Sequence, residues 1–292
     1  MKRSFLLKII LILWAFGFSS CKYYTYGLEE FLYRSGTVEK RTESVLELTD
    51  QDVPVVPNEG NYNILIVADI HFGHATYKND VDFFITSITD YLNSMPADEK
   101  PLFCICLGDI AEHGLKSEFD DFSKFANKLS ELGIKTYSIL GNHDLYNSGW
   151  RIYKDVIFPF TSFYYFKTDV FSFYFIDSAS GSLGKSQMNK LEGLLAKDEN
   201  PKIVATHVPL YADGYFYFSM QNTTERNLLI SMLAKNNVKA ILSGHTHSTN
   251  FTNFGKFTEY NFSSVITYND IGIVTVNQND NSVYAKVINL NK

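Results

Sequence analysis

The sequence has few cysteines, little excess charge and no long hydrophobic run, and each scarcity argues against a class of protein. Its three cysteines form no paired CxxC motif of the kind that holds structural zinc. The 26 basic and 32 acidic residues are interspersed and give a net charge of -6, which disfavours a nucleic acid polymer as partner. With 45% hydrophobic and 20% charged residues, the 292-residue composition excludes a disordered chain, a collagen-like repeat and a polytopic membrane protein.

Residues 1–20 are predicted to be a secretory signal peptide. Three basic residues precede an apolar run at 9–18, about half of the ~20 residues needed to span a bilayer. The following stretch, Phe18-Ser19-Ser20-Cys21, resembles a bacterial lipobox, although Leu is commoner than Phe at its first position. We therefore predict an exported lipoprotein whose acyl anchor on Cys21 holds it at a membrane, facing the periplasm or the cell exterior. An ordinary signal peptide or short anchor with an incidental cysteine is the alternative.

The hydrophobic pattern predicts a single α/β domain at residues 61–292, preceded by a tether and irregular lead-in at 21–60. The apolar run 64–68 is typical of a strand covered on both faces, and residues 79–94 have helical spacing. This alternation continues, which predicts a layered domain with helices outside. Further strands are expected at 102–107, 135–140, 162–177 (two strands), 202–206, 238–243 and 257–290, and helices at 117–132, 185–197 and 223–236.

Cys104 and Cys106 lie two apart in one predicted strand. Side chains at i and i+2 project from the same face of an extended chain, which is a poor geometry for a disulfide. We interpret both as small buried apolar residues.

Five predicted strands run directly into residues of the types that bind metals. Polar ligand sites of α/β domains collect at the carboxyl ends of strands, where the loops meet. Residues two apart in these clusters would point the same way if the backbone were extended, and the glycines would allow a tight turn before a ligand. The clusters are Asp69-Ile70-His71, Gly108-Asp109, Gly141-Asn142-His143-Asp144, His207 and Gly244-His245-Thr246-His247.

Apart from His143 and Asp144, the clusters offer two carboxylates, one amide oxygen and four imidazoles, which suffices for two divalent ions. Mixed shells of this kind accept Mn, Fe or Zn. A pair of ions can lower the pKa of a bridging water and hold the entering and leaving oxygens of a phosphoryl group. A lone buried histidine is more often a hydrogen-bonded core residue, but an ordered set of five clusters is highly specific.

In this order, D-x-H, G-D, G-N-H-D, H and G-H-x-H resemble the calcineurin-like metallophosphoesterase superfamily, over about residues 61–250. The resemblance implies an α/β sandwich of two sheets flanked by helices, with a dinuclear metal centre. It implies that His143 faces the substrate, beside Asn142, as general acid or transition-state stabiliser. The implied ligands are Asp69, His71, Asp109 and His247 for one ion, and the bridging Asp109 with Asn142, His207 and His245 for the other.

Three further residues near the motifs are candidates through the same resemblance. Glu112 replaces an Asp that pairs with the catalytic histidine in many relatives, so it would orient His143; it cannot supply the tyrosine ligand of purple acid phosphatases. His113 lies where protein Ser/Thr phosphatases place a phosphate-contacting arginine, and His74 follows the first motif. Both are candidate substrate contacts, and a solvent-exposed loop histidine is the equal alternative for each.

Residues 163–166, 175–178 and 184–187 resemble segments of bacterial class III cyclic-nucleotide phosphodiesterases and of purple acid phosphatases. The aromatic stretch 211–218 follows His207 and borders the predicted site; its rings would stack a nucleobase, line an acyl groove or pack on the body. We hypothesise hydrolysis of a small phosphomonoester or phosphodiester, in which a metal-bridging hydroxide attacks phosphorus and His143 assists the leaving group.

Two rivals to this hypothesis come from other classes. One is a non-catalytic lipoprotein that keeps the scaffold as a metal-binding module, although such a protein need not retain every ligand. The other is a zinc hydrolase acting on amides, which predicts a His-x-His-x-Asp-His cluster that the sequence lacks. The substrate, the metals and the oligomeric state are left open by the sequence.

Overall fold

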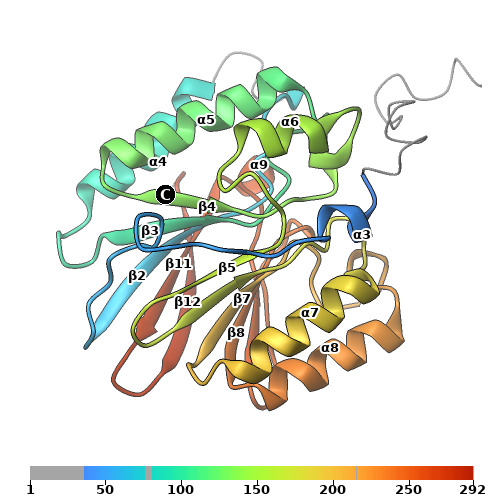
Figure 1. The fold of residues 1–292 in the computed structure, drawn as a ribbon. Coiled ribbons are helices and arrows are strands. Elements are labelled where there is room, and N and C mark those ends of the chain that lie inside the picture. Colours follow the sequence, from blue (N-terminus) through green and yellow to red (C-terminus); the bar gives the residue numbers. More distant parts are fainter. Residues whose placement is uncertain (1–35, 76–80, 215, 292) are drawn as a thin grey trace, which may run out of the picture.

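The computed structural model describes residues 36–75, 81–214 and 216–291, and in it two β-sheets pack face to face (Figure 1). One sheet has the strand order β1-β5-β6-β7-β8-β10-β9 and the other β12-β11-β2-β3-β4. The strands of the first are β1 (Leu46–Glu47), β5 (Tyr164–Lys167), β6 (Ser172–Phe175), β7 (Lys202–Ala205), β8 (Val238–Ser243), β9 (Asn250–Asn253) and β10 (Thr258–Asn261). Those of the second are β2 (Asn61–Val67), β3 (Pro101–Cys106), β4 (Lys135–Ser138), β11 (Asp270–Asn277) and β12 (Ser282–Asn289).

Helices cover the outer face of each sheet, which confirms the predicted two-sheet sandwich flanked by helices (Figure 1). On the five-stranded sheet lie α4 (Val81–Ser94), α5 (Lys116–Glu131) and α6 (Gly149–Val156). On the seven-stranded sheet lie α7 (Gly184–Lys197) and α8 (Thr223–Lys235). The short helices α3 (Val38–Arg41) and α9 (Val265–Tyr268) and the 3-10 turns His143–Leu145 and Phe216–Phe218 complete the described elements.

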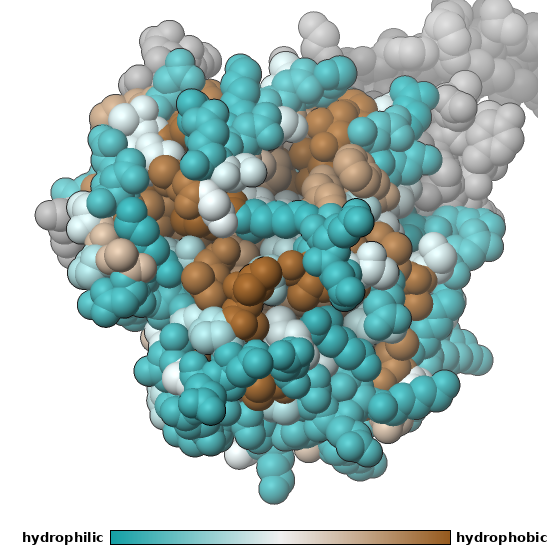
Figure 2. Space-filling model, turned by 60° about the vertical axis from the view of Figure 1, so that its left-hand side comes forward, coloured by the Kyte–Doolittle hydropathy of each residue, from teal (hydrophilic) through white to brown (hydrophobic). Residues whose placement is uncertain are grey.

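The core has three layers because each central strand buries both of its faces. Ile64 and Ile66 point into the core between the sheets, whereas Leu65 and Val67 point into the core under the helices. Cys104 and Cys106 are buried under the helices as free cysteines, as predicted. On the face seen in Figure 2, hydrophilic side chains surround smaller groups of hydrophobic ones.

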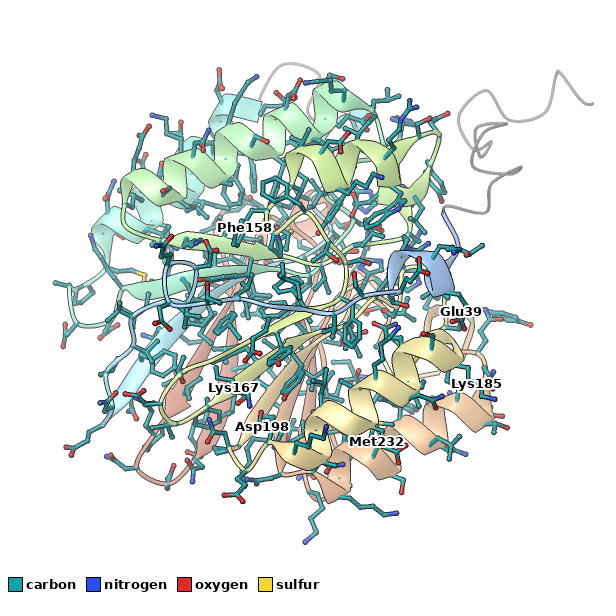
Figure 3. All side chains as sticks on the ribbon, viewed as in Figure 1. Glu39, Phe158, Lys167, Lys185, Asp198 and Met232 are labelled. Atoms are coloured by element: carbon teal, nitrogen blue, oxygen red, sulfur yellow. The ribbon has the colours of Figure 1, made fainter. Side chains whose placement is uncertain are left out.

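The lead-in segment differs from the irregular tether that the sequence predicts. Helix α3 packs on α7, and β1 pairs in parallel with β5 at the edge of the seven-stranded sheet. The carboxylate of Glu39 accepts hydrogen bonds from the main-chain nitrogens of Lys185 (2.9 Å) and Ser186 (3.3 Å), and Figure 3 shows Glu39 beside Lys185. These nitrogens belong to the first turn of α7, where they lack partners within the helix, so the lead-in caps this helix.

The predicted signal peptide and the lipobox at Cys21 lie outside the described residues. Among the helices of the described part of the chain, none has the length and hydrophobicity that crossing a membrane requires. Helix α6, strand β9 and helix α9 are further elements that the sequence pattern did not predict. Each is short, and β9 alternates between partly buried and exposed residues without a hydrophobic run.

Candidate metal centre

The five predicted clusters meet at one end of the sandwich, beyond the carboxyl ends of strands from both sheets. The carboxylate of Asp69, after β2, accepts the main-chain N–H of His245, after β8, at 2.9 and 3.0 Å. Among the described residues, three groups have ligand atoms within 4.8 Å of one another: Asp69 with His71 and His247, Asp109 with His71 and His143, and Asp109 with His207 and His245. The structure therefore brings the sequence-predicted residues together from the ends of five strands, β2, β3, β4, β7 and β8.

Asp109 lies where the groups meet. Its Oδ2 is 3.6 Å from Nε2 of His71 on one side and 3.5 Å from Nε2 of His207 on the other. On the second side, Nε2 of His207 also lies 3.0 Å from Oδ1 of Asn142 and 3.2 Å from Nδ1 of His245. On the first side, Nε2 of His247 lies 3.1 Å from Nε2 of His71. One carboxylate oxygen thus lies between two groups of side chains, one with His71 and His247 and the other with Asn142, His207 and His245, which we call the two half-sites.

Two of the histidines are held so that a particular ring nitrogen faces the cluster. Nδ1 of His207 lies 2.8 Å from the carbonyl oxygen of Leu107, and Nδ1 of His247 lies 3.2 Å from Oγ1 of Thr267. When these Nδ1 atoms carry the proton, each Nε2 turns a lone pair toward its neighbours. Imidazole lone pairs and carboxylate oxygens that face one another at these distances fit a bound cation, so the residues present suit the metals that the motifs predict.

Burial and the neighbouring charges set the protonation of the cluster. Burial, together with the charge of Asp109, raises the pKa of Asp69 to about 7 against the opposing effect of His207. Burial would also raise the pKa of Asp109, but His207 and His71 hold it well below its usual value. Burial and the charge of His207 lower the pKa of His245 to about 3, so this imidazole is neutral at neutral pH, as a metal ligand must be.

The loops that carry these residues have a left-handed backbone rather than the extended one expected from the spacing. Positive φ angles of 48–71° occur at Asp69, His71, Asp109, His245 and His247. Residues other than glycine rarely adopt this region, and such strain collects at functional sites. Gly141 has no room for a side chain, because a Cβ atom there would overlap the main-chain nitrogen and the carboxylate of Asp109.

Asp144, the last residue of the Gly141–Asp144 cluster, has a structural function that the sequence reasoning missed. Its Oδ1 accepts the N–H of Ala111 at 2.8 Å and its Oδ2 accepts the N–H of Gly141 at 2.9 Å. The fully buried carboxylate thus ties the loop after β3 to the loop after β4. The position of Asp144 in the G-N-H-D motif is the sequence feature from which this function could have been predicted. Burial and the charge of Asp109 raise the pKa of Asp144 to about 7.

His143 is held by a different group of Glu112 from the one that the sequence predicts. Its Nδ1 lies 2.9 Å from the main-chain oxygen of Glu112, and its main-chain N–H donates to Oδ1 of Asp109 at 2.8 Å. The Glu112 carboxylate is 3.7 Å from His143 but 2.8 Å from Nδ1 of His71, at ion-pair distance though outside hydrogen-bond geometry. The ring of His143 is partly exposed, and its contact with a substrate stays a prediction.

The two remaining candidate histidines lie on neighbouring loops. His113 is fixed by Glu118, whose carboxylate contacts its Nδ1 at 2.9 Å and accepts its main-chain N–H at 2.9 Å. His74 is exposed, and its N–H donates to the carbonyl of His71 at 3.0 Å. Their contact with a substrate stays a prediction.

A cavity of about 430 Å³ adjoins the cluster at Asn142 and His245. Its walls include Ser180 and Gly181, from the loop after β6, and Tyr217, from the aromatic stretch that the sequence places near the site. The ring of Phe218, from the same stretch, lies 5.9 Å from the ring of His245. A larger cavity of about 500 Å³ lies between α7 and α8, and none of the candidate metal ligands lines it.

Comparisons with known proteins agree with this fold and cluster. The profile of the calcineurin-like phosphoesterase family matches residues 62–249, so the chain belongs to this family. It is therefore a metal-dependent phosphoric ester hydrolase. A probable cyclic nucleotide phosphodiesterase from Fibrobacter succinogenes (strain ATCC 19169 / S85) is 27% identical over 189 residues, which cover 62% of this chain and 71% of the relative.

Solved structures share the fold at low sequence identity. A dimetal phosphatase from Danio rerio has a TM-score of 0.60 at 12% identity, over 80% of this chain and 100% of that one. GAP50, described as the anchor in the inner membrane complex of Plasmodium, has a TM-score of 0.59 at 13% identity, over 80% and 86%. The purple acid phosphatase PPD1 from yellow lupin (Lupinus luteus) has a TM-score of 0.53 at 14% identity, over 81% and 55%.

Proposed function

We propose that the protein hydrolyses small phosphoesters at a centre that holds two divalent ions. The observation that carries the proposal is the position of the Asp109 carboxylate between the two half-sites, 3.6 Å from His71 and 3.5 Å from His207. Asp69, His71 and His247 would hold one ion, and Asn142, His207 and His245 the other. Mn, Fe or Zn ions bound there would supply positive charge to stabilise the transition state and an acidified water as nucleophile.

The protein's own residues would orient the ester and deliver a proton. Asn142 lines the 430 Å³ cavity, where the ester would lie, and His143 belongs to the adjoining cluster. His143, fixed through Nδ1 by the carbonyl of Glu112, would donate the Nε2 proton to the departing oxygen. The name of the Fibrobacter succinogenes relative supports a diester as substrate, whereas the dimetal and purple acid phosphatase folds fit either ester class.

The direct test is an assay of the metal-loaded protein with paired monoesters and diesters. Asp109→Asn should lose both metal content and hydrolysis, whereas Asp280→Asn, at an exposed position, should retain both. His143→Gln should lose about 10²- to 10⁴-fold in kcat with alkyl leaving groups and much less with p-nitrophenolate, which needs little protonation. Two bound metals without hydrolysis of any ester would favour the non-catalytic alternative.

We further propose that the enzyme acts outside the cytoplasm from an acyl anchor on Cys21. The support is the sequence of residues 1–21, with its basic start, short apolar run and lipobox-like end. Cys21→Ser should release the protein from the membrane fraction and abolish labelling by a radioactive fatty acid. Unchanged labelling of this variant would contradict the anchor.

A further inference from the structure

Arg41 of the lead-in segment contacts Ser180, which is part of the wall of the 430 Å³ cavity beside the cluster. Arg41 donates from Nε to Oδ2 of Asp177 at 2.7 Å and from Nη2 to Oδ1 at 2.9 Å, and both side chains are fully buried. The same Nη2 lies 3.0 Å from Oγ of Ser180, which lines the cavity. The side-chain amide of Gln187 holds the main chain of Asp177. Its oxygen accepts the N–H of Asp177 at 2.8 Å, and its nitrogen donates to the carbonyl oxygen of Asp177 at 2.8 Å.

This arrangement fixes the direction of the Ser180 hydroxyl. A guanidinium group only donates hydrogen bonds, so Oγ of Ser180 must be the acceptor in its contact with Arg41. The hydroxyl proton then points away from Arg41. Because Ser180 is exposed and lines the cavity, that proton is available to an acceptor atom of a bound molecule.

The cavity suits a flat organic group that carries acceptors. Its volume of about 430 Å³ falls within the ~300–1,000 Å³ typical of small-molecule sites. Besides Ser180, the wall includes Tyr217, which has an aromatic ring, and Gln221, which has an amide. Because Asn142 and His245 belong to the same wall, an ester with its phosphate on the metal cluster would place its organic group here.

We propose that Ser180 is a specificity-determining residue that donates a hydrogen bond to the organic group of the ester, and that Arg41 is the positioning residue that orients it. This inference rests on the proposed phosphoester hydrolysis. The preferred substrates are esters whose organic group is a ring bearing hydrogen-bond acceptors, as in a nucleoside, over esters of plain phenol.

The test compares two diesters with the same leaving group, p-nitrophenyl thymidine 5′-phosphate and p-nitrophenyl phenyl phosphate. Ser180→Ala should raise KM for the thymidine ester about five-fold, the size expected for one lost hydrogen bond, and leave kcat and the phenyl ester unchanged. Ser231→Ala, at an exposed serine that lines the cavity between α7 and α8, is the matched control and should change nothing. Equal KM values for wild type and Ser180→Ala, or equal effects on both esters, would overturn the inference.

Arg41→Lys separates the two contacts of Arg41, because one ammonium can pair with Asp177 without reaching Ser180. It should raise KM for the thymidine ester as Ser180→Ala does, and the double variant should be no worse than either single one. An additive loss would remove Arg41 from the proposal.

If the wild type hydrolyses no ester, the proposed function fails, but calorimetric binding of thymidine still tests Ser180. About five-fold weaker binding by Ser180→Ala would support its role as donor, and equal binding would refute it.

Discussion

The Oε2 atom of Glu112 lies 2.8 Å from Nδ1 of His71 and 3.7 Å from Nδ1 of His143. The nearer histidine is a predicted metal ligand, and its Nε2 faces Asp109 and His247. A carboxylate behind a ligating histidine fixes the ring and raises its basicity as a ligand. The carboxylate of Glu112 is therefore placed to support metal binding by His71, while the main-chain oxygen of Glu112 contacts Nδ1 of His143.

Replacing Glu112 by Gln should weaken Mn²⁺ binding about 10-fold, because the charge behind His71 is removed. Calorimetric titration of the metal-free protein measures this directly. Glu131→Gln, at an exposed glutamate at the end of α5, should leave the affinity unchanged. Unchanged Mn²⁺ affinity in Glu112→Gln, together with a loss of kcat that depends on the leaving group, would assign the carboxylate to His143 instead.

Metal binding should stabilise the fold, because it neutralises the buried carboxylates of Asp69 and Asp109. Adding Mn²⁺ at a hundred-fold excess over Kd to chelator-treated protein should raise the free energy of unfolding by about 3 kcal/mol. Asp69→Asn should lose most of this gain, whereas Asp280→Asn should keep it. Urea unfolding with and without Mn²⁺ gives the answer, and identical curves for the wild type would contradict metal binding by the folded state.

Gly141→Ala should unfold the loop that carries Asn142 and His143, since a Cβ atom there collides with Asp109. We expect a loss of stability of about 1–3 kcal/mol and of Mn²⁺ binding. Gly193→Ala is the matched control: it lies inside α7 with no atom near its Cβ, and should gain about 0.5–1 kcal/mol. Urea unfolding measures both, and a Gly141→Ala variant as stable as wild type would show that the loop can move aside.

The buried Glu259 should make stability depend on pH. Its carboxylate accepts the N–H groups of Leu210 (2.8 Å) and Tyr211 (3.1 Å), and burial raises its pKa to about 7. The folded state thus holds a proton that the unfolded state releases above about pH 4.5, so this contribution to stability is present at low pH and is lost as the pH rises through 7.

Glu259→Gln imitates the protonated form and removes this dependence. Between pH 5 and 8, the wild type should lose about 2–3 kcal/mol relative to the variant. Denaturant unfolding of both proteins at each pH measures the difference, and parallel pH profiles would show that Glu259 does not titrate in this range.

The candidate ligands could be predicted because they directly follow strands, whose hydrophobic runs are visible in the sequence. Asp69 and Asp109 follow the paired parallel strands β2 and β3, and His207 and His245 follow the paired parallel strands β7 and β8, so each pair meets within its own sheet. The packing of the two sheets then brings both pairs together. Their role as ligands stays a prediction. The left-handed backbone at Asp69 was not predictable from spacing, because residues other than glycine rarely adopt it and the spacing alone suggested an extended chain.

Contacts between distant segments could not be predicted from the sequence either. Arg41 and Asp177 are 136 residues apart, and nothing local to either indicates the other. Strand β1 has only two residues, too few for a period-two pattern to be recognised. The lead-in was therefore predicted to be irregular, although its arginine is among the buried polar residues of the fold.

The family match begins at residue 62, after the arginine that pairs with Asp177. A recombinant fragment trimmed to the matched region would bury the Asp177 charge without its partner, which typically costs about 3–5 kcal/mol. It would also lose the carboxylate that caps α7. Poor yield or low activity of such a fragment would report on where it was cut and not on the chemistry of the intact enzyme.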